Sequence, residues 1–263
     1  MSKGIATLLQ TMRALRHPET GCPWDRAQTM TSILPYTMEE VYELVDAVER
    51  GEAEDIRDEL GDLLFHVVYY AQIADEQGSF DFNSVVKGVD EKLKRRHPHV
   101  FGSVKAGPTQ ARGKAWEEIK KQERRQQGKP EAGLLETVNP ALPALQAACG
   151  LQKKAAIVGF DWDVIGPVVD KVEEELREFR QELERGGDMR RLAEETGDML
   201  FACVNLARHA GVDPETALRA ANRKFRDRFR YIESRLSEDG RRPEDVGLEE
   251  LEALWQEAKK SEV

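Results

Sequence analysis

The chain repeats itself, and this internal repeat limits its fold more than any other feature of the sequence. Five short segments recur in the same order in the two halves. The spacing between matched residues stays between 132, from Lys92 to Lys224, and 139, from Trp116 to Trp255. We therefore interpret the chain as a tandem duplication of one domain. The matched pairs are Gly21-Cys-Pro-Trp-Asp25 with Gly159-Phe-Asp-Trp-Asp163, Glu39-Glu-Val-Tyr-Glu43 with Glu174-Glu-Leu-Arg-Glu178, Glu59-Leu-Gly-Asp62 with Glu195-Thr-Gly-Asp198, Lys92-x-x-x-Arg96 with Lys224-x-x-x-Arg228, and Trp116-x-x-x-Lys120 with Trp255-x-x-x-Lys259.

Apolar residues recur at helical spacing through nearly the whole chain, whereas the alternating runs typical of strands are hard to find. The pattern predicts an all-α fold in which each copy is a helical bundle. Gly51 and the pair Gly186-Gly187 suit helix C-termini, and Asp213-Pro214 is typical of a helix start. The expected helices span residues 3–16, 36–49, 53–77, 82–96, 110–126, 141–155, 167–185, 189–210, 214–237 and 247–260.

The region between the two copies has the composition of a linker. Residues 126–143 include several glycines and prolines together with Asn139, and these residues interrupt helices. We expect two domains, residues 1–128 and 129–263, which fits a chain of 263 residues.

The charge balance excludes several classes of protein. The net charge is -10, which argues against binding to nucleic-acid phosphates or anionic lipid. The longest apolar stretch, residues 63–74, is too short to span a bilayer. The 3 cysteines are widely spaced and form no Cys-x-x-Cys motif. We expect a soluble, reduced, cytoplasmic protein with no nucleic-acid or membrane partner.

Acidic side chains are paired at helical spacing in both copies. Residues three or four apart share one helix face, so Glu40 and Glu43 project together, as do Glu59 and Asp62. If the short turn at Gly51 makes these helices antiparallel, the four carboxylates converge and require a cation. Oxygen ligands favour Mg²⁺ or Mn²⁺ over zinc, and the absence of Glu-x-x-His weakens a di-iron interpretation. The equivalent residues in the second copy are Glu175, Glu178, Glu195 and Asp198.

Two ordinary explanations compete with a metal site. Acidic runs on helices are usually solvated faces, and Glu40 would serve only a helix start if Thr37 were its N-cap. The second copy weakens the capping explanation, because Lys171 stands shortly before its carboxylates and Pro167 suits the helix start better. The distance between the carboxylate pairs is also kept, with 19 residues from Glu43 to Asp62 and 20 from Glu178 to Asp198. We therefore favour a metal site.

Basic residues and indoles also recur downstream. Lys224 and Arg228 share a helix face, as do Trp255 and Lys259. Lys and Arg neutralise phosphate oxygens, and a Trp ring stacks on a base. The competing explanation is a core Trp beside ordinary surface charge, so each pair alone leaves both readings open.

In combination, these motifs resemble the two-domain bacterial MazG nucleoside triphosphate pyrophosphohydrolases. The resemblance also rests on Arg95-Arg-His-Pro-His-Val-Phe101 and Val158-Gly-Phe-Asp-Trp162, and it runs nearly end to end. It implies an all-α, Mg²⁺-dependent, dimeric enzyme that binds ATP or another nucleoside triphosphate and cleaves it to the monophosphate and pyrophosphate. The family's metal ligands fall on Glu175, Glu178, Glu195 and Asp198, and its nucleotide-binding residues on Lys171, Lys224, Arg228, Trp255 and Lys259. We also assign Glu194 to the nucleotide site.

A difference in charge between the two copies predicts which of them catalyses the reaction. The second copy has Arg190-Arg191 where the first has Glu54-Asp55, and Asn222 replaces Asp90. Arg191 lies one turn before Glu195, so it would reach phosphate oxygens beside the metal, whereas Asp55 would repel them. We predict that the second domain dominates catalysis, with Glu174 as a candidate for orienting or deprotonating water.

Two other functions stay open at this point. The repeats would also suit a nucleotide-binding or protein-interaction regulatory module without turnover. A damaged or signalling nucleotide would use the same mechanism on another substrate. Base preference is not readable, because aromatic stacking tolerates every base.

Overall fold

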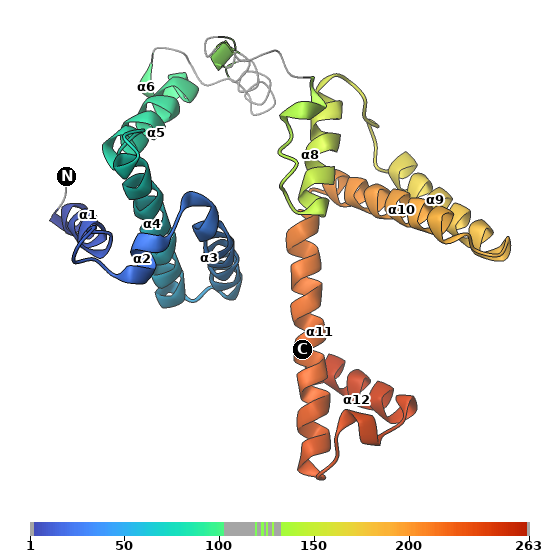
Figure 1. Cartoon of the computed structure of the whole chain (residues 1–263). Helices are drawn as coiled ribbons and strands as arrows, with labels where there is room; N and C mark the ends of the chain where they lie inside the picture. The colour runs from blue at the N-terminus through green and yellow to red at the C-terminus, as the bar shows by residue number, and fades with distance from the viewer. Residues whose placement is uncertain are drawn as a thin grey trace. The chain divides into compact units, whose positions relative to one another are not determined.

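A computed structural model of the chain describes residues 3–102, 119, 122–123, 125, 128 and 133–261. Over these residues the chain forms helices and turns and no strand, which confirms the predicted all-α fold. It divides into two compact units, Met1–Ile119 and Lys120–Val263, drawn in Figure 1. The helix expected at 110–126 falls outside the described residues apart from four isolated positions, and Trp116 and Lys120 lie outside them as well.

The first unit is built around an antiparallel helix pair. Helix α3 packs against α4, and α1 packs against the other end of α4 (Figure 1). Gly51 ends α3 with a φ of 80°, the left-handed conformation that glycine adopts without a steric penalty. The described helices are α1 (Lys3–Leu15), α2 (Pro23–Ala27), α3 (Met30–Arg50), α4 (Ala53–Glu76), α5 (Phe82–Arg96) and α6 (Pro98–Phe101).

Helix α3 begins earlier than the sequence pattern predicted. Its N-cap is Thr29, whose hydroxyl accepts from the Ser32 amide at 3.1 Å, while the Ser32 hydroxyl accepts from the Thr29 amide at 2.8 Å. This reciprocal pair satisfies amides at the start of the helix, which therefore begins at Met30. The alternative in which Thr37 caps the helix is wrong, because Thr37 lies inside α3 and its hydroxyl contacts the Ile33 carbonyl oxygen.

The core of the first unit is filled by large side chains. Met12, Ile33 and Tyr69 are at most 1% exposed. The Tyr69 hydroxyl donates to the Asp25 carbonyl oxygen at 2.8 Å, which joins α4 to α2. The Arg16 guanidinium lies 5.4 Å from the centre of the Tyr69 ring, and burial raises the pKa of Tyr69 to about 12. These bonds fix the tyrosine ring at the centre of the unit.

The second unit uses the same helix pairing. Helix α10 packs against α9 and α8, and α12 packs against α11. Asp213 caps α11 by accepting from the Thr216 amide at 2.9 Å, as its position before Pro214 predicted. In Figure 1, α12 lies along the far half of α11, away from α9 and α10. The elements are η1 (Leu135–Thr137), α8 (Ala144–Ile157), α9 (Gly166–Glu184), α10 (Met189–His209), α11 (Pro214–Glu238), η2 (Pro243–Asp245) and α12 (Leu248–Ser261).

Part of the region expected to be a linker packs onto the second unit. The side chain of Val138 approaches Gly150 on α8 so closely that a Cβ there would lie 3.1 Å from it. Residues 133–143 therefore belong to the second unit's packing and bring Leu135 toward the site described below. None of the described helices is long and apolar enough to cross a membrane.

Candidate functional site

Three of the four predicted carboxylates of the first unit come together. Glu40 and Glu43 extend from α3 and Glu59 from α4, and each offers an oxygen within 4.8 Å of the others. Burial raises the pKa of Glu40, and the charges of Asp62, Glu43 and Glu59 raise it further. The fourth predicted residue, Asp62, therefore acts on the same cluster electrostatically.

The second unit contains the equivalent cluster with a different distribution of ligands. Glu175 comes from α9, and Glu195 and Asp198 come from α10, again with oxygens within 4.8 Å of one another. Burial raises the pKa of Glu195, and the charges of Glu178, Asp198 and Glu175 add to that effect. Glu175 is only 5% exposed. Glu178 thus contributes charge beside the three residues that the structure brings within ligand distance.

Both clusters fit a hard divalent cation. Their donors are all carboxylate oxygens, which suit Mg²⁺ or Mn²⁺. The raised pKa values of Glu40 and Glu195 are the expected consequence of partly desolvated negative charges held close together. A divalent cation would remove that repulsion, so each cluster is a candidate metal centre.

Lys171 already compensates part of the charge in the second cluster. Its ammonium nitrogen lies 2.8 Å from Glu174 Oε1 and 2.8 Å from Glu175 Oε1. The two carboxylates raise the pKa of Lys171, so the lysine stays cationic at neutral pH. In return, Lys171 lowers the pKa of Glu174. The first unit has Tyr36 at the matching position, four residues before Glu40, and so lacks this cation.

A cavity of about 470 Å³ adjoins the second cluster. Lys171, Glu175 and Asp198 form part of its wall, so the cavity and the carboxylates belong to one site. Most of the remaining wall is apolar or aromatic, which suits a flat organic group. The other lining residues are Leu135, Leu151, Gln152, Ala155, Phe160, Asp161, Trp162, Val168, Phe201, Ala202, Asn205 and Arg208.

A charged network holds the polar wall of this cavity in place. The Arg208 guanidinium donates to Asp161 Oδ2 at 2.9 Å and to Asn205 Oδ1 at 3.0 Å. His209 Nε2 lies 2.8 Å from Asp161 Oδ1. Arg208 and His209 lower the pKa of Asp161 to about 2, so Asp161 is ionised at neutral pH and fixes Arg208.

Large rings stand at two matching positions of the first unit. A spacing of 136 residues relates α4 to α10, so His66 matches Ala202 and Tyr69 matches Asn205. Both rings are buried. His66 Nδ1 lies 2.8 Å from the Thr37 hydroxyl, and burial lowers the pKa of His66, which leaves the imidazole neutral at pH 7. The first unit therefore has a large ring at each of the two positions where the second unit has the smaller side chains of Ala202 and Asn205.

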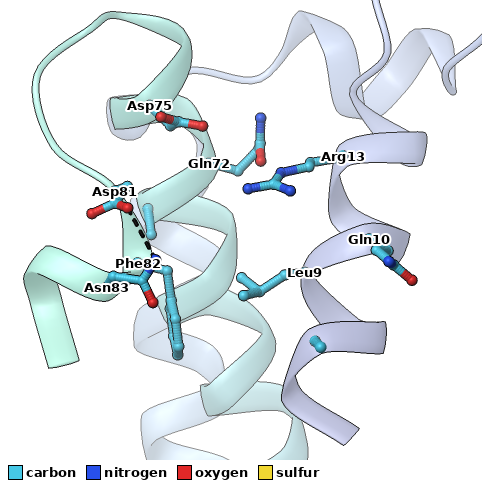
Figure 2. A pocket seen from close by; sticks show the side chains of 10 residues that line it. Leu9, Gln10, Arg13, Gln72, Asp75, Asp81, Phe82 and Asn83 are labelled. Atoms are coloured by element: carbon cyan, nitrogen blue, oxygen red, sulfur yellow. Dashed lines mark hydrogen bonds between the residues drawn. The ribbon is translucent and has the colours of Figure 1, made fainter. Parts of the chain in front are cut away.

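A smaller hollow in the first unit has no part in its carboxylate cluster. It measures about 170 Å³ and lies between α1, the end of α4 and the start of α5. Figure 2 shows Arg13 of α1 facing Gln72 and Asp75 of α4, with Phe82 below them. Asn83 donates to Asp81 at 3.2 Å at its edge. None of the four predicted metal ligands of this unit lines the hollow.

The other predicted nucleotide-binding residues lie on different helices. Lys224 and Arg228 are on α11, and Trp255 and Lys259 are on α12. The Arg228 guanidinium lies 5.3 Å from the Trp255 ring centre, so these two predicted residues are brought together. We call these four residues the α11–α12 set; α12 packs on α11 and lies away from α9 and α10 (Figure 1).

Two further predicted residues lie on α10 near the cluster. Arg191 precedes Glu195 by one turn and is exposed. Glu194 forms an exposed ion pair with Arg190 at 3.2 Å. Such exposed pairs contribute little to stability, so this pairing does not prevent Glu194 from meeting a ligand.

Sequence reasoning missed several residues around the two clusters. Two of them carried a usable signal, because His66 follows Asp62 by four residues and Asn205 follows Asp198 by seven, which places each on the same helix face. Gln152 carried no such signal. It reaches the cavity from α8 through tertiary packing alone.

Comparison with known proteins decides the family. Residues 28–101 and 168–232 each match the family described as MazG nucleotide pyrophosphohydrolase domain. The chain belongs to the MazG family. The two matches enclose both carboxylate clusters, which confirms the tandem MazG duplication that the sequence predicted.

Similar proteins extend over almost the whole MazG chain. A protein of Escherichia coli strain K12 named nucleoside triphosphate pyrophosphohydrolase is 48% identical, with 98% of each chain covered. A protein of Thermotoga maritima named nucleoside triphosphate pyrophosphohydrolase/pyrophosphatase MazG is 45% identical, with 96% of this chain and 94% of that protein covered. Because both domains are included in these similarities, the MazG assignment applies to the full chain.

Proposed function

We propose that this MazG protein hydrolyses nucleoside triphosphates to nucleoside monophosphate and pyrophosphate, with Mg²⁺, in its second unit. The observation that carries the proposal is the junction of the cluster Glu175, Glu195 and Asp198 with the 470 Å³ cavity. The cluster offers a place for metal-bound phosphates, and the aromatic cavity offers a place for the nucleoside. The names of the similar proteins support the same reaction.

Each charged group near the cluster has a role in this proposal. Glu175, Glu178, Glu195 and Asp198 would hold the metal. Bound Mg²⁺ supplies neutralisation of phosphate charge, including charge that develops on the leaving pyrophosphate. Lys171 and Arg191 would contact phosphate oxygens, and Glu194 would lie at the edge of the nucleotide.

Glu174 is our candidate for positioning the attacking water. Lys171 donates to Glu174 and lowers its pKa, so Glu174 is ionised at neutral pH and would accept a hydrogen bond from the attacking water. The same lowered pKa makes Glu174 a weaker base, so we assign it orientation of the water ahead of proton removal.

Removing the metal is expected to abolish turnover and leave the fold intact. EDTA should stop pyrophosphate release, because the carboxylates then repel both one another and the triphosphate. Adding excess Mg²⁺ should restore it, with Mn²⁺ as the alternative metal. Pyrophosphate assay and circular dichroism measure activity and helicity in the same samples. Release of orthophosphate by the metal-loaded protein would contradict the reaction, and full activity in EDTA would contradict the metal requirement.

We further propose that the active form is a homodimer. Leu176, Leu183, Leu200 and Met189, on α9 and α10, are each at least 45% exposed, which leaves apolar surface for a second copy to cover. Helix α12, which carries Trp255 and Lys259, lies away from α9 and α10 of its own chain (Figure 1), so a partner copy would be the source of these residues at the nucleotide.

Light scattering tests the dimer directly. At micromolar concentration we expect a mass twice that of the 29.8 kDa chain. Leu200→Glu should shift the protein toward the monomer, because it places charge in the apolar surface, whereas Glu184→Gln at an exposed position should leave the mass unchanged. A monomeric mass for the unmodified chain would refute the proposal.

The first unit is better suited to a supporting role than to turnover. It has a carboxylate cluster, but Tyr36 stands in place of Lys171, and His66 and Tyr69 fill positions that line the second unit's cavity. We propose that it binds metal and contributes to assembly or regulation.

A further inference from the structure

One residue that lines the cavity beside the second cluster, Gln152, has a polar side-chain atom without a hydrogen-bond partner within the described part of the chain. Gln152 is 8% exposed and lines the cavity from α8. Its Nε2 donates to the Phe201 carbonyl oxygen at 2.8 Å. Its Oε1 is buried and, within the described part of the chain, makes no hydrogen bond. A buried acceptor left in this state is destabilising unless a ligand or water donates to it.

The hydrogen bond to Phe201 determines which end of the Gln152 amide is the nitrogen and which is the oxygen. A backbone carbonyl oxygen only accepts hydrogen bonds, so the atom facing Phe201 must be the nitrogen. The remaining atom, Oε1, is an acceptor. Gln152 therefore offers a carbonyl oxygen to any ligand that reaches its side chain from the cavity.

A second amide on the cavity wall has the opposite polarity. The Asn205 Oδ1 accepts from Arg208, which only donates, at 3.0 Å from Nε and 2.7 Å from an Nη atom. Asn205 therefore has its Nδ2 left as the donor. Phe160, Trp162 and Phe201 add aromatic surface to the same cavity. An acceptor and a donor in an aromatic cavity match the edge and the faces of a nucleobase.

We propose that Gln152 is a specificity-determining residue of the nucleotide site, and that its Oε1 accepts a hydrogen bond from a ring N–H or exocyclic amino group of the substrate base. The inference rests on the proposed function, since the triphosphate is taken to lie at Glu175 and Asp198 on the same cavity. It adds a base-recognition role to a residue on α8, outside the two helices that carry the carboxylates.

The substrate itself provides the first test, with the unmodified protein. ATP carries a 6-amino donor and ITP a ring N–H, whereas purine riboside triphosphate has no donor on its base; CTP is paired in the same way with 2-pyrimidinone riboside triphosphate. We expect kcat/KM for the donor-free compound to fall about five- to tenfold below the better donor-bearing one in at least one pair, the size of one lost hydrogen bond. Donor-free and donor-bearing compounds cleaved within twofold of each other in both pairs would overturn the proposal.

A substitution then assigns the effect to Gln152. Gln152→Met keeps the volume and removes the acceptor, and it should abolish the preference for donor-bearing bases. Its cleavage of ribose 5-triphosphate, which has no base, should stay within twofold of the unmodified protein. The exposed Gln181→Met on α9 is the matched control and should retain the preference. A preference that survives in a folded Gln152→Met protein would refute the assignment.

The outcomes separate this inference from the proposed function. If no nucleoside triphosphate yields pyrophosphate, the reaction itself is wrong. If all are cleaved without regard to base donors, the reaction stands and Gln152 has no part in base recognition. Circular dichroism of each variant identifies a loss caused by unfolding, and the analogue series with the unmodified protein then still decides the question.

Discussion

Glu195→Gln is expected to reduce pyrophosphate release by at least about a hundredfold, whereas Glu59→Gln is expected to leave it within about twofold. The two residues occupy matching positions, and both belong to carboxylate clusters. Loss of a metal ligand removes several kcal/mol of charge stabilisation from the transition state, and each 1.4 kcal/mol is about tenfold in rate. Within the described part of the chain, the cavity of about 470 Å³ is lined by members of the second cluster and by none of the first. Steady-state assays at saturating Mg²⁺ give the comparison.

Two other outcomes would contradict this expectation. Equal losses would show that both units catalyse the reaction. A loss confined to Glu59→Gln would reverse the assignment of the active unit. Glu178→Ala and Glu43→Ala repeat the comparison at another matched pair of acids, and circular dichroism checks that helicity is retained in all four variants.

Ala202→His should also abolish most turnover, for a steric reason. Position 202 lies in the cavity wall, and the first unit already carries a histidine at the matching position. An imidazole there would occupy space assigned to the base, so we expect kcat/KM for nucleoside triphosphates to fall by about a hundredfold, comparable to other misplacements of a bound substrate. Titration with Mn²⁺ should show that the variant still binds metal.

A control variant and one contradicting outcome test this prediction. His66→Ala in the first unit should leave turnover intact, while lowering thermal stability because it empties a buried position. Full activity of a correctly folded Ala202→His protein would mean that the base does not use the cavity.

The sequence predicted most helices because amphipathic periodicity and turn residues are local signals. Gly51 and Asp213-Pro214 ended or began helices where expected, since left-handed backbone and N-capping depend on the residue itself. The start of α3 was missed because Pro35 interrupts the pattern, although the capping pair Thr29 and Ser32 begins the helix upstream of it.

The carboxylate clusters were predictable for the same local reason, because spacing along two antiparallel helices fixes which acids share a face. The cavity was not. It depends on small side chains such as Ala202 and on α8, whose Gln152 reaches the site only through packing. Likewise, Lys171 was expected near the nucleotide, but its bonds to Glu174 and Glu175 became evident only in three dimensions.

Tyr69 and Asn205, at matching positions, show that the two copies of the domain meet different structural requirements. At one position a buried ring joins two helices, and at the matching position an amide borders a hollow. If the second copy alone admits substrate, as we propose, the first copy is free to accumulate changes that favour stability. The second copy must keep a cavity in its interior, which leaves its core less well packed. Substitutions that alter substrate preference are therefore expected mainly in the second copy and rarely in the first.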